Sequence, residues 1–596
     1  MASYAPPLRD MRFIYHELHD CDALAALPGL SEFTADLVDP VLEEAGKLCA
    51  EVLQPLNRPG DEEGCRLENG VVRTPKGFPE AYRLFREGGW TALACDPAYG
   101  GQGAPAVLDT LVAEMICSAN LSFGIYPGLS HGAYCALHDH ASDALKDTYL
   151  PKIVAGTWSG TMCLTEPHCG TDLGLIRTRA LPADDGSYRI TGTKIFISAG
   201  EHDLTDNIIH LVLAKLPDAP TGSGGISLFL VPKFLPDGDG SLGARNGVQC
   251  SSLEHKMGIK GSATCVLNFD DATGWLVGKP HQGLKAMFTM MNNERLAVGV
   301  QGLGLGEASY QGAVAYARDR LQGRSLSGTK APDKPADPII VHPDVRRMLM
   351  IQRATSEGCR ALAVWVARAL DEQNHHPDPE SRKAAGDLVG LMTPIVKALL
   401  TDLGTESANL GMQVLGGHGY IREHGMEQYV RDARIAQIYE GTNGIQALDL
   451  VGRKIGMNGG RPLRRFFHPV AEHIAARAGD ATLAPFVGPL ARAFGKLQLA
   501  TAEVARRGIA EPEEAGAAAT DYLRLFGLTA LAYMWARMAE IAAARIAASE
   551  DADGFYAAKL VTARFYMDRI LPQTSALFAQ ITAGGASIMA LDEAAF

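Results

Sequence analysis

The spacing of apolar residues changes twice along this chain of 596 residues. Up to residue 158 apolar side chains recur at intervals of three and four, as at Val41, Leu42 and Ala45, which predicts amphipathic helices. Short apolar runs separated by Gly, Asp and Ser clusters follow, and these predict strands and turns. The helical spacing then returns. The pattern predicts an α+β, mainly α protein with one small β domain in its middle.

Strands are expected at 161–164, 188–190, 194–198, 208–214, 226–231 and 263–269. Short strands at this spacing predict a small antiparallel barrel. The whole chain then divides into an N-terminal arm (1–34), an N-terminal helical domain (35–158), a central β-barrel domain (159–280), a second helical domain (281–456) and an additional C-terminal helical domain (463–596). The arm is expected to pack against the body, and the Gly- and Pro-rich residues 456–462 form a linker.

Composition excludes several classes of function. The chain carries 55 Lys and Arg against 68 Asp and Glu, a net charge of −13 without long runs of one sign, which argues against nucleic acid as a partner. Eleven scattered cysteines without a CxxC pair indicate reduced thiols rather than disulfides or a zinc site. No secretory signal and no apolar run near 18 residues is found, so we expect a cytoplasmic protein without a transmembrane segment.

Two local patterns could suggest a ligand, but neither predicts one. The glycine-rich loop at 96–104 does not follow a strand and lacks the P-loop lysine, so it is not a nucleotide-binding turn. His375 and His376 stand side by side in a proline-rich break between helices, without partner ligands. We interpret them as solvated and expect no metal.

Glu440 is the strongest candidate for catalysis. A helical run ends at Tyr439, Glu440 follows, and Gly441 and Thr442 are typical of a turn and a helix cap. A second amphipathic run begins after Gly444. A carboxylate between two helices can project into a cleft, where partial desolvation would raise its pKa toward the working pH of a general base. By itself the string is more typical of an ordinary helix end without a chemical role.

Two motifs in the predicted barrel give Glu440 its context. The first is LTEPHCGTD at 164–172, which resembles the LTEPxxGSD signature of the acyl-CoA dehydrogenase family, with Thr171 in place of the usual serine. The second is GTKIFISAG at 192–200, similar to GxKxxITNG of the same family. Alternation along a strand places Phe196 and Ser198 on one face, so an aromatic ring and a hydroxyl could meet the same ligand.

Three further motifs follow in the order of that family. Residues 291–297 (MNNERLA) resemble the helix that meets the CoA thioester, with Arg295 placed to reach a phosphate or pantetheine. Residues 316–324 match YxxxRxxFG only in part: Arg320 is present, but Gly323 and Arg324 replace Phe-Gly, so contacts to adenosine are expected to differ. Residues 413–420 (QVLGGHGY) are close to QxxGGxGY, whose glycines let a pyrophosphate approach the backbone.

The resemblance spans about residues 35–455, and the arm and tail resemble a larger bacterial branch that includes 3-(methylthio)propanoyl-CoA dehydrogenases. It implies an FAD-dependent oxidoreductase in which Glu440 removes the α-proton and flavin N5 accepts the β-hydride. It assigns cofactor contacts to Met162, Leu164, Thr165, Thr171, Phe196, Ser198, Arg320, Gln413, Gly416, Gly417, Thr442 and Gly444. It assigns substrate contacts to Thr171, Met291, Asn292, Arg295, Tyr439 and Gly441.

The resemblance also implies partners. The product would be a trans-2-enoyl-CoA, and electrons would pass to electron-transferring flavoprotein. We expect a homodimer, because the C-terminal domain would cover a face that smaller relatives use to form tetramers. The substrate stays open between a fatty acyl-CoA and 3-(methylthio)propanoyl-CoA. Two alternatives also stay open: an acyl-CoA oxidase that uses O₂, and a non-catalytic relative of the fold.

Overall fold

The computed structural model describes residues 4–237 and 240–596, except for the side chain of Asn293. The chain forms two compact units. The helical unit comprises Met1–Gly46, Pro105–Ser118 and Val298–Phe596. The barrel unit comprises Lys47–Ala104 and Ala119–Ala297. The division into five domains predicted above stays a prediction.

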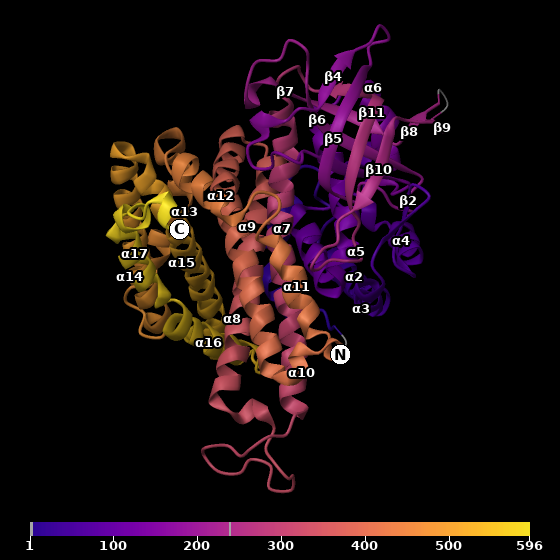
Figure 1. Ribbon diagram of the computed structural model, residues 1–596. Helices are drawn as coiled ribbons and strands as arrows, with labels where there is room; N and C mark the ends of the chain where they lie inside the picture. Colours follow the sequence, from indigo (N-terminus) through magenta and orange to yellow (C-terminus); the bar gives the residue numbers. More distant parts are fainter. Residues whose placement is uncertain (1–3, 238–239) are drawn as a thin grey trace. The chain divides into compact units, whose positions relative to one another are not determined.

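The barrel unit contains a seven-stranded sheet built around a closed ring (Figure 1). The strands are β3 (Trp158–Cys163), β4 (Arg179–Pro182), β5 (Tyr188–Ser198), β6 (Asn207–Lys215), β7 (Ile226–Pro232), β10 (Val248–Leu253) and β11 (Thr264–Val277). β11 pairs with β5, β5 with β4, β4 with β6, β6 with β7, and β7 again with β11. The expected barrel is therefore confirmed, and its interior is filled by apolar side chains such as Val212, Phe229 and Leu267.

The sheet differs from the prediction in three ways. β3 and β6 run parallel, so the barrel is not purely antiparallel. The two runs expected at 188–190 and 194–198 are one strand, β5, because the residues between them also pair with β11, Gly192 with Phe269 and Thr193 with Asn268. β4 and β10 were not predicted, since their exposed and half-buried residues carry little apolar signal.

Short elements surround this sheet. They are α3 (Gln54–Glu63), the hairpin of β1 (Arg66–Glu68) and β2 (Val71–Arg73), α4 (Phe78–Glu87), α6 (Asp143–Val154) and the hairpin of β8 (Phe234–Pro236) and β9 (Leu242–Arg245). Two long helices, α5 (Ala106–His140) and α7 (Gly283–Asp319), have residues in both units. α5 bends at Asn120, whose φ of −162° and ψ of 89° are not helical.

Within the helical unit α8 and α9 pack side by side, and α11 lies along α9 (Figure 1). The bounds are α8 (Pro343–His375), α9 (Pro379–Leu415), α10 (Gly417–Tyr420), α11 (Met426–Ala436) and α12 (Asn443–Asp449). Asp378 caps α9 by accepting hydrogen bonds from the N–H groups of Glu380 and Ser381. His375 and His376 bond to nearby backbone groups in the short break before α9.

The C-terminal residues form a bundle around one buried helix, as the apolar period of this region predicts. The helices are α13 (Arg461–Arg477), α14 (Ala484–Ala510), α15 (Pro512–Ala547), α16 (Phe555–Phe565), α17 (Gln573–Ala583) and α18 (Ala586–Met589). α15 packs against α14, α16 and α17, and its Trp535 and Phe526 are fully buried. A helix that is apolar on nearly all sides belongs at the centre of such a bundle.

Buried ion pairs connect the N-terminal arm to the rest of the helical unit. Asp10 on α1 (Leu8–Arg12) forms ion pairs with Arg360 of α8 and Lys559 of α16, and all three side chains are buried. Arg360 also meets Glu114 at 2.5 Å. Burial raises the pKa of Glu114 to about 7, against the pull of Arg360. The arm therefore packs against the helical unit as expected, and α2 (Ala35–Leu48) follows it.

Two helices of the described chain pass a length and composition test for a membrane span. They are α5 and α9, each with an 18-residue window of mean hydropathy 1.3. The sequence analysis expected none. In both helices 78% of that window is buried inside the structure, as in the core helices of globular proteins. The absence of a transmembrane segment stays a prediction.

Candidate active site

The first motif of the barrel unit forms a tight turn at the end of β3. Met162 lies on β3 and is buried, Leu164 and Thr165 follow it half-buried, and Thr171 is exposed. Glu166 and Cys169 exchange two backbone hydrogen bonds of 3.0 Å, which close the turn. The turn therefore presents exposed backbone and the Thr171 side chain beyond a buried strand.

The carboxylate of Glu166 holds this turn from inside. It accepts hydrogen bonds from the Arg177 N–H (2.7 Å), from the N–H and hydroxyl of Thr178 (3.0 and 2.6 Å) and from Lys194 Nζ (2.9 Å). Burial acts to raise the pKa of Glu166, but Lys194 and these donors outweigh it, and the pKa is lowered. Lys194 also donates to the Leu164 carbonyl at 2.9 Å. The sequence analysis did not assign either residue a role.

The same carboxylate explains why a possible metal cluster is not one. Among the described residues, Glu166, His168 and Cys169 place ligand atoms within 4.8 Å of one another. The four donors above already occupy both oxygens of Glu166, and His168 Nε2 donates to the Leu175 carbonyl at 2.9 Å. The chemistry of this set therefore does not favour a metal.

The second motif lies beside the first. The Ile195 N–H donates to the Thr165 carbonyl at 2.9 Å, and the Thr161 hydroxyl donates to the Ser198 carbonyl at 2.8 Å. Phe196 has a φ of +58°, and its side chain is 58% exposed. Phe196 and the half-buried Ser198 flank the buried Ile197, beside a register shift between Lys194 and Ile197.

The third motif lies on α7. Met291 is buried, Asn292 is exposed and Arg295 is half-buried. Arg295 Nη1 donates to Asn292 Oδ1 at 3.2 Å, one turn away. Arg295 and Asn292 therefore lie on one face of the helix, and the exposed Asn292 leaves that face reachable.

The fourth and fifth motifs belong to the helical unit and are linked to each other. Arg320 follows the last residue of α7 and is exposed. Gln413 near the end of α9 is exposed, as are Gly416, with a φ of +59°, and Gly417. The Tyr316 hydroxyl and His418 Nδ1 lie 2.7 Å apart and connect the two motifs.

Glu440 lies between α11 and α12, as the sequence predicts. It is half-buried and adopts a φ of +56°, and Gly441 follows with a φ of +86°. Thr442 caps α12 by accepting a 3.3 Å hydrogen bond from the Ile445 N–H, and Gly444 is exposed in the first turn. The hydroxyl of the half-buried Tyr439 donates to Gln301. The carboxylate thus stands on a tight turn whose neighbours are fixed.

Residues that the sequence analysis missed hold this turn. Lys397 of α9 is fully buried and donates to the Gly441 carbonyl (2.8 Å) and Asn443 Oδ1 (2.9 Å). Gln446 Nε2 reaches the carbonyls of Glu440 (3.4 Å) and Gly441 (3.3 Å). A signal was available, because a lysine within the apolar run of residues 389–400 must find buried acceptors.

The residues expected to hold a flavin nucleotide fit such a group. Within the described part of the chain no atom lies within 4 Å of the place a Cβ would take on Gly416 or Gly417, so a pyrophosphate could approach both. Phe196 offers an exposed aromatic face, and Arg320 an exposed cation. These are the features that a ring system and a diphosphate require.

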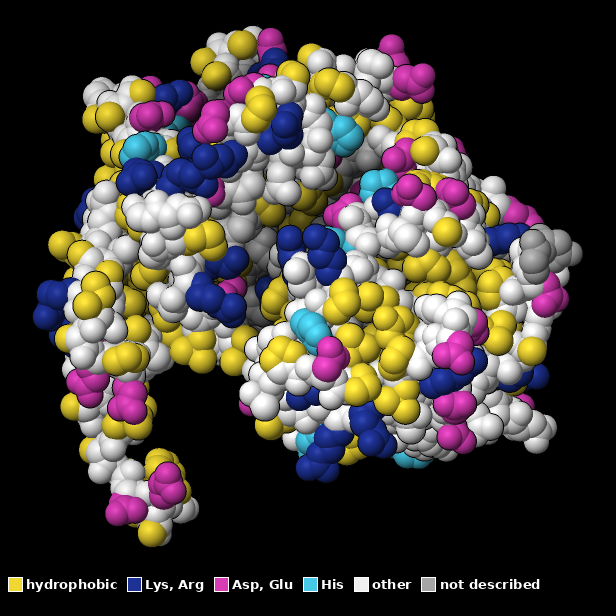
Figure 2. Space-filling model, turned by 90° about the horizontal axis from the view of Figure 1, so that it is seen from above, with side chains coloured by type: hydrophobic (Ala, Val, Ile, Leu, Met, Phe, Trp, Pro, Cys, Tyr) yellow, Lys and Arg dark blue, Asp and Glu magenta, His cyan; other side chains and the backbone are white. Residues whose placement is uncertain are grey.

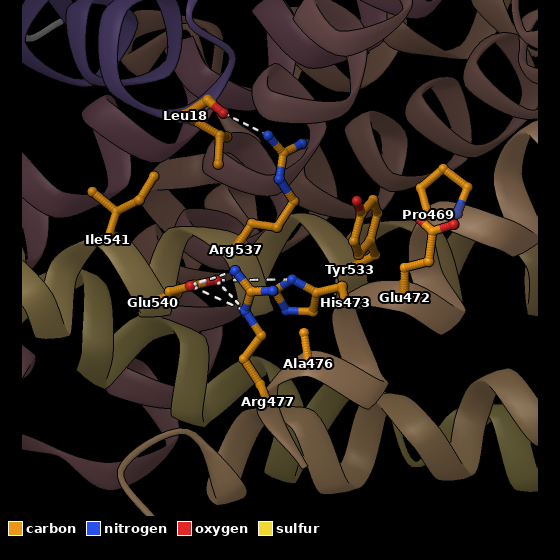
Figure 3. Close-up of a pocket in the computed structure, with 10 residues that line it drawn as sticks. All are labelled: Leu18, Pro469, Glu472, His473, Ala476, Arg477, Tyr533, Arg537, Glu540 and Ile541. Atoms are coloured by element: carbon orange, nitrogen blue, oxygen red, sulfur yellow. Dashed lines mark hydrogen bonds and ion pairs between the residues drawn. The ribbon is translucent and has the colours of Figure 1, made fainter. Parts of the chain in front are cut away.

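A cavity of about 410 Å³ lies elsewhere in the helical unit (Figure 3). It is lined by Leu18, Pro469, Glu472, His473, Ala476, Arg477, Tyr533, Arg537, Glu540 and Ile541. Arg477 pairs with Glu540 at 2.7 Å, and Arg537 donates to the Leu18 carbonyl at 2.5 Å. Burial lowers the pKa of His473 to about 4, so it is neutral near pH 7. These internal pairings make the cavity a weak candidate for a charged ligand.

On the face seen in Figure 2, Lys and Arg side chains form several separate groups with Asp and Glu between them. This distribution agrees with the acidic net charge and offers no continuous basic stripe on that face.

Four family models match the chain in succession. They are described as acyl-CoA dehydrogenase N-terminal domain (residues 41–157), middle domain (161–272) and C-terminal domain (281–455), and as acetyl-CoA dehydrogenase C-terminal like (466–592). The motifs described above fall within the second and third of these ranges.

Two curated relatives cover nearly the whole chain. The 3-methylmercaptopropionyl-CoA dehydrogenase of Ruegeria pomeroyi is 44% identical over 98% of this chain and 99% of its own length. A butyryl-CoA dehydrogenase of Syntrophomonas wolfei is 34% identical over 100% of this chain and 99% of its own.

A solved structure shares the fold. It is an acyl-CoA dehydrogenase complexed with FAD from Bacillus anthracis, with a TM-score of 0.74 and 20% identity over 93% of this chain and 89% of that one.

Proposed function

Because this chain belongs to the acyl-CoA dehydrogenase family, a family of FAD-dependent oxidoreductases, we propose that Glu440 is its catalytic base and that it acts on a short acyl-CoA. The observation that carries the role of Glu440 is its place on a fixed turn between α11 and α12. A carboxylate held there, half-buried, has the reach and the partial desolvation that a general base needs.

The residues of the turn have different roles in proton removal. Glu440 takes the proton from the carbon next to the thioester carbonyl. That proton becomes acidic as charge develops on the thioester oxygen, and the backbone N–H of Glu440, with a hydroxyl of FAD, would stabilise that charge. Tyr439, fixed through Gln301, and Gly441 border the place of the acyl group. Asn292 and Arg295 would meet the CoA part, since Arg suits phosphate.

Each unit contains residues that we propose as cofactor contacts. Exposed Thr171 and the β5 residues Phe196 and Ser198 would contact the flavin ring, together with Met162, Leu164 and Thr165. Arg320, Gln413, Gly416 and Gly417 would hold the diphosphate, and Thr442 and Gly444 would lie beside the ring. When bound, FAD supplies the acceptor for the hydride that leaves the β-carbon.

For the substrate we favour 3-methylmercaptopropionyl-CoA. The relative with 44% identity over nearly the full length carries that activity in its name. Butyryl-CoA is the second candidate, because the relative at 34% identity is named for it and its acyl chain has nearly the same length. Bleaching of the flavin by a panel of CoA esters, from methylthio and short to long chains, decides between them. Fastest bleaching by a long-chain ester contradicts the proposal.

Replacing Glu440 with Gln tests the base. Glu440→Gln removes the proton acceptor and keeps the shape, so we expect FAD to stay bound and its reduction by substrate to fall by about 10⁴-fold or more. Glu380→Gln, an exposed carboxylate on α9, is the matched control and should behave as wild type. Full reduction in Glu440→Gln contradicts the assignment.

The electron acceptor is proposed to be electron-transferring flavoprotein. An oxidase of the same fold would release peroxide in air instead, so peroxide measured beside reduction of the carrier separates the two. A non-catalytic relative would yield a colourless protein that FAD cannot reconstitute.

The assembly and location are proposed as a homodimer in the cytoplasm, without nucleic acid or a membrane span. The additional C-terminal bundle of α13 to α18 supports the dimer, because it offers a second layer over one face of the helical unit. The mass in solution tests this, and a stable tetramer contradicts it.

A further inference from the structure

The turn that carries Glu440 is anchored on α9 by one buried cation. Lys397 is fully buried, and its Nζ lies 2.8 Å from the Gly441 carbonyl and 2.9 Å from Asn443 Oδ1. An ammonium placed among apolar side chains requires hydrogen-bond acceptors. Here it finds them in the residue after Glu440 and in the residue that begins α12.

Asn443 extends this anchor along α9. Its Nδ2 donates to Asp402 Oδ1 at 2.7 Å and to Thr401 Oγ1 at 3.0 Å, while its Oδ1 faces Lys397. Asp402 Oδ1 also accepts from Gln437 Nε2 at 2.6 Å, on the other side of Glu440. Both ends of the turn are therefore fixed to one face of α9, and the amide of Asn443 has a single favourable orientation.

These bonds decide where the backbone N–H groups point. Lys397 of α9 donates to the Gly441 carbonyl, and Gln446 of α12 donates to the carbonyls of Glu440 and Gly441. In a planar trans peptide the N–H points away from the C=O, so the N–H groups of Gly441 and Thr442 turn outward. Within the described chain neither N–H donates a hydrogen bond. Two oriented donors are thus available to a ligand next to Glu440.

The backbone of Glu440 also needs support. A glutamate at a φ of +56° persists only where its surroundings hold it. We propose that Lys397 is a positioning residue, which holds the Gly441 carbonyl on α9 and thereby fixes the left-handed Glu440. The proposal rests on the proposed function for the identity of the base. It adds the device that places that base and its neighbouring donors.

The test uses the full-length holoenzyme with Lys397→Met, which removes the ammonium and nearly keeps the length of the side chain. Lys383→Met, an exposed lysine of the same helix, is the matched control. Amide hydrogen exchange of a peptide covering residues 437–446 reports the turn without any turnover. We expect exchange about tenfold faster in Lys397→Met, since a buried hydrogen-bonded anchor is lost. Lys383→Met should exchange as wild type.

Kinetics supply the second readout. In Lys397→Met we expect kcat to fall by about 100-fold, because misplacing a reacting group by about 1 Å has an effect of that size. KM and FAD content should stay within about threefold, since the anchor lies behind the turn. A global loss of stability alone would instead lower FAD content and kcat together.

Unchanged exchange of 437–446, or a kcat within about threefold of wild type, overturns the proposal. If Glu440→Gln keeps full activity, the base is wrong, while the exchange result still decides the role of Lys397. If Lys397→Met does not fold, Lys397→Arg keeps the charge and displaces the donor. We then expect smaller shifts in the same directions, and unchanged exchange with unchanged kcat overturns the proposal.

Discussion

Two turns, one in each unit, are built alike and anchored differently. The turn after β3 packs beside Phe196, and the turn before α12 carries Glu440. Phe196 has a φ of +58° and Glu440 a φ of +56°. Behind each lies a fully buried lysine, Lys194 in the barrel unit and Lys397 in the helical unit. Each lysine donates to a backbone carbonyl of its own turn.

The two lysines differ in their second hydrogen-bond acceptor. Lys194 meets the carboxylate of Glu166 at 2.9 Å, whereas Lys397 meets the neutral amide oxygen of Asn443 at 2.9 Å. Removing one partner of a buried ion pair leaves the other charge unpaired. Removing the Lys397 ammonium leaves the oxygens of Gly441 and Asn443 with weaker hydrogen bonds. We conclude that the first anchor contributes mainly to stability and the second mainly to geometry.

The largest expected effect is on the ion pair. Lys194→Met should lower the free energy of unfolding by about 3–5 kcal/mol, because the buried carboxylate of Glu166 loses its counter-ion. Lys397→Met should lower it by about 1 kcal/mol, because Gln446 and Thr401 still reach the two oxygens. Chemical denaturation measures both, with the exposed Lys76→Met as control. Equal losses in the two buried variants contradict the comparison.

An acid titration tests how much the Glu166 carboxylate contributes to stability. The folded pKa of Glu166 lies below its ordinary value of 4.5, so the native state binds this proton less readily than the unfolded chain. Its contribution is present above pH 4.5 and is lost as the pH falls toward the folded value. In Glu166→Gln the free energy of unfolding should fall less steeply as the pH decreases, by up to about 1.4 kcal/mol per pH unit. Denaturation curves between pH 3 and 6 measure it. An unchanged slope contradicts the role of Glu166.

The smallest expected effect concerns backbone strain. A left-handed backbone conformation is unfavourable for every residue that has a Cβ atom. Glu440→Gly should therefore be more stable than Glu440→Ala by about 1 kcal/mol. Phe196→Gly and Phe196→Ala should differ in the same direction. Thermal denaturation measures each pair. If the alanine variant is the more stable one at either position, the turn there is not strained.

Much of the fold was predictable because the signals are local. Helical spacing gave the long helices, and turn residues marked the place of Glu440 between α11 and α12. The short strands β4 and β10 were missed because each carries only a few apolar residues. The parallel pairing of β3 with β6 was missed because the alternation of apolar and polar residues does not show which strands pair or in which direction.

The sequence by itself determined which family this chain belongs to and where its candidate base stands, since motifs and caps are properties of neighbouring residues. Only the tertiary structure decided what holds the two turns. Lys194 meets Glu166 across 28 positions, and Lys397 meets Gly441 across 44. A lysine within an apolar run indicates that hydrogen-bond acceptors must lie nearby in the fold. Which distant oxygens these are depends on how the helices and strands pack.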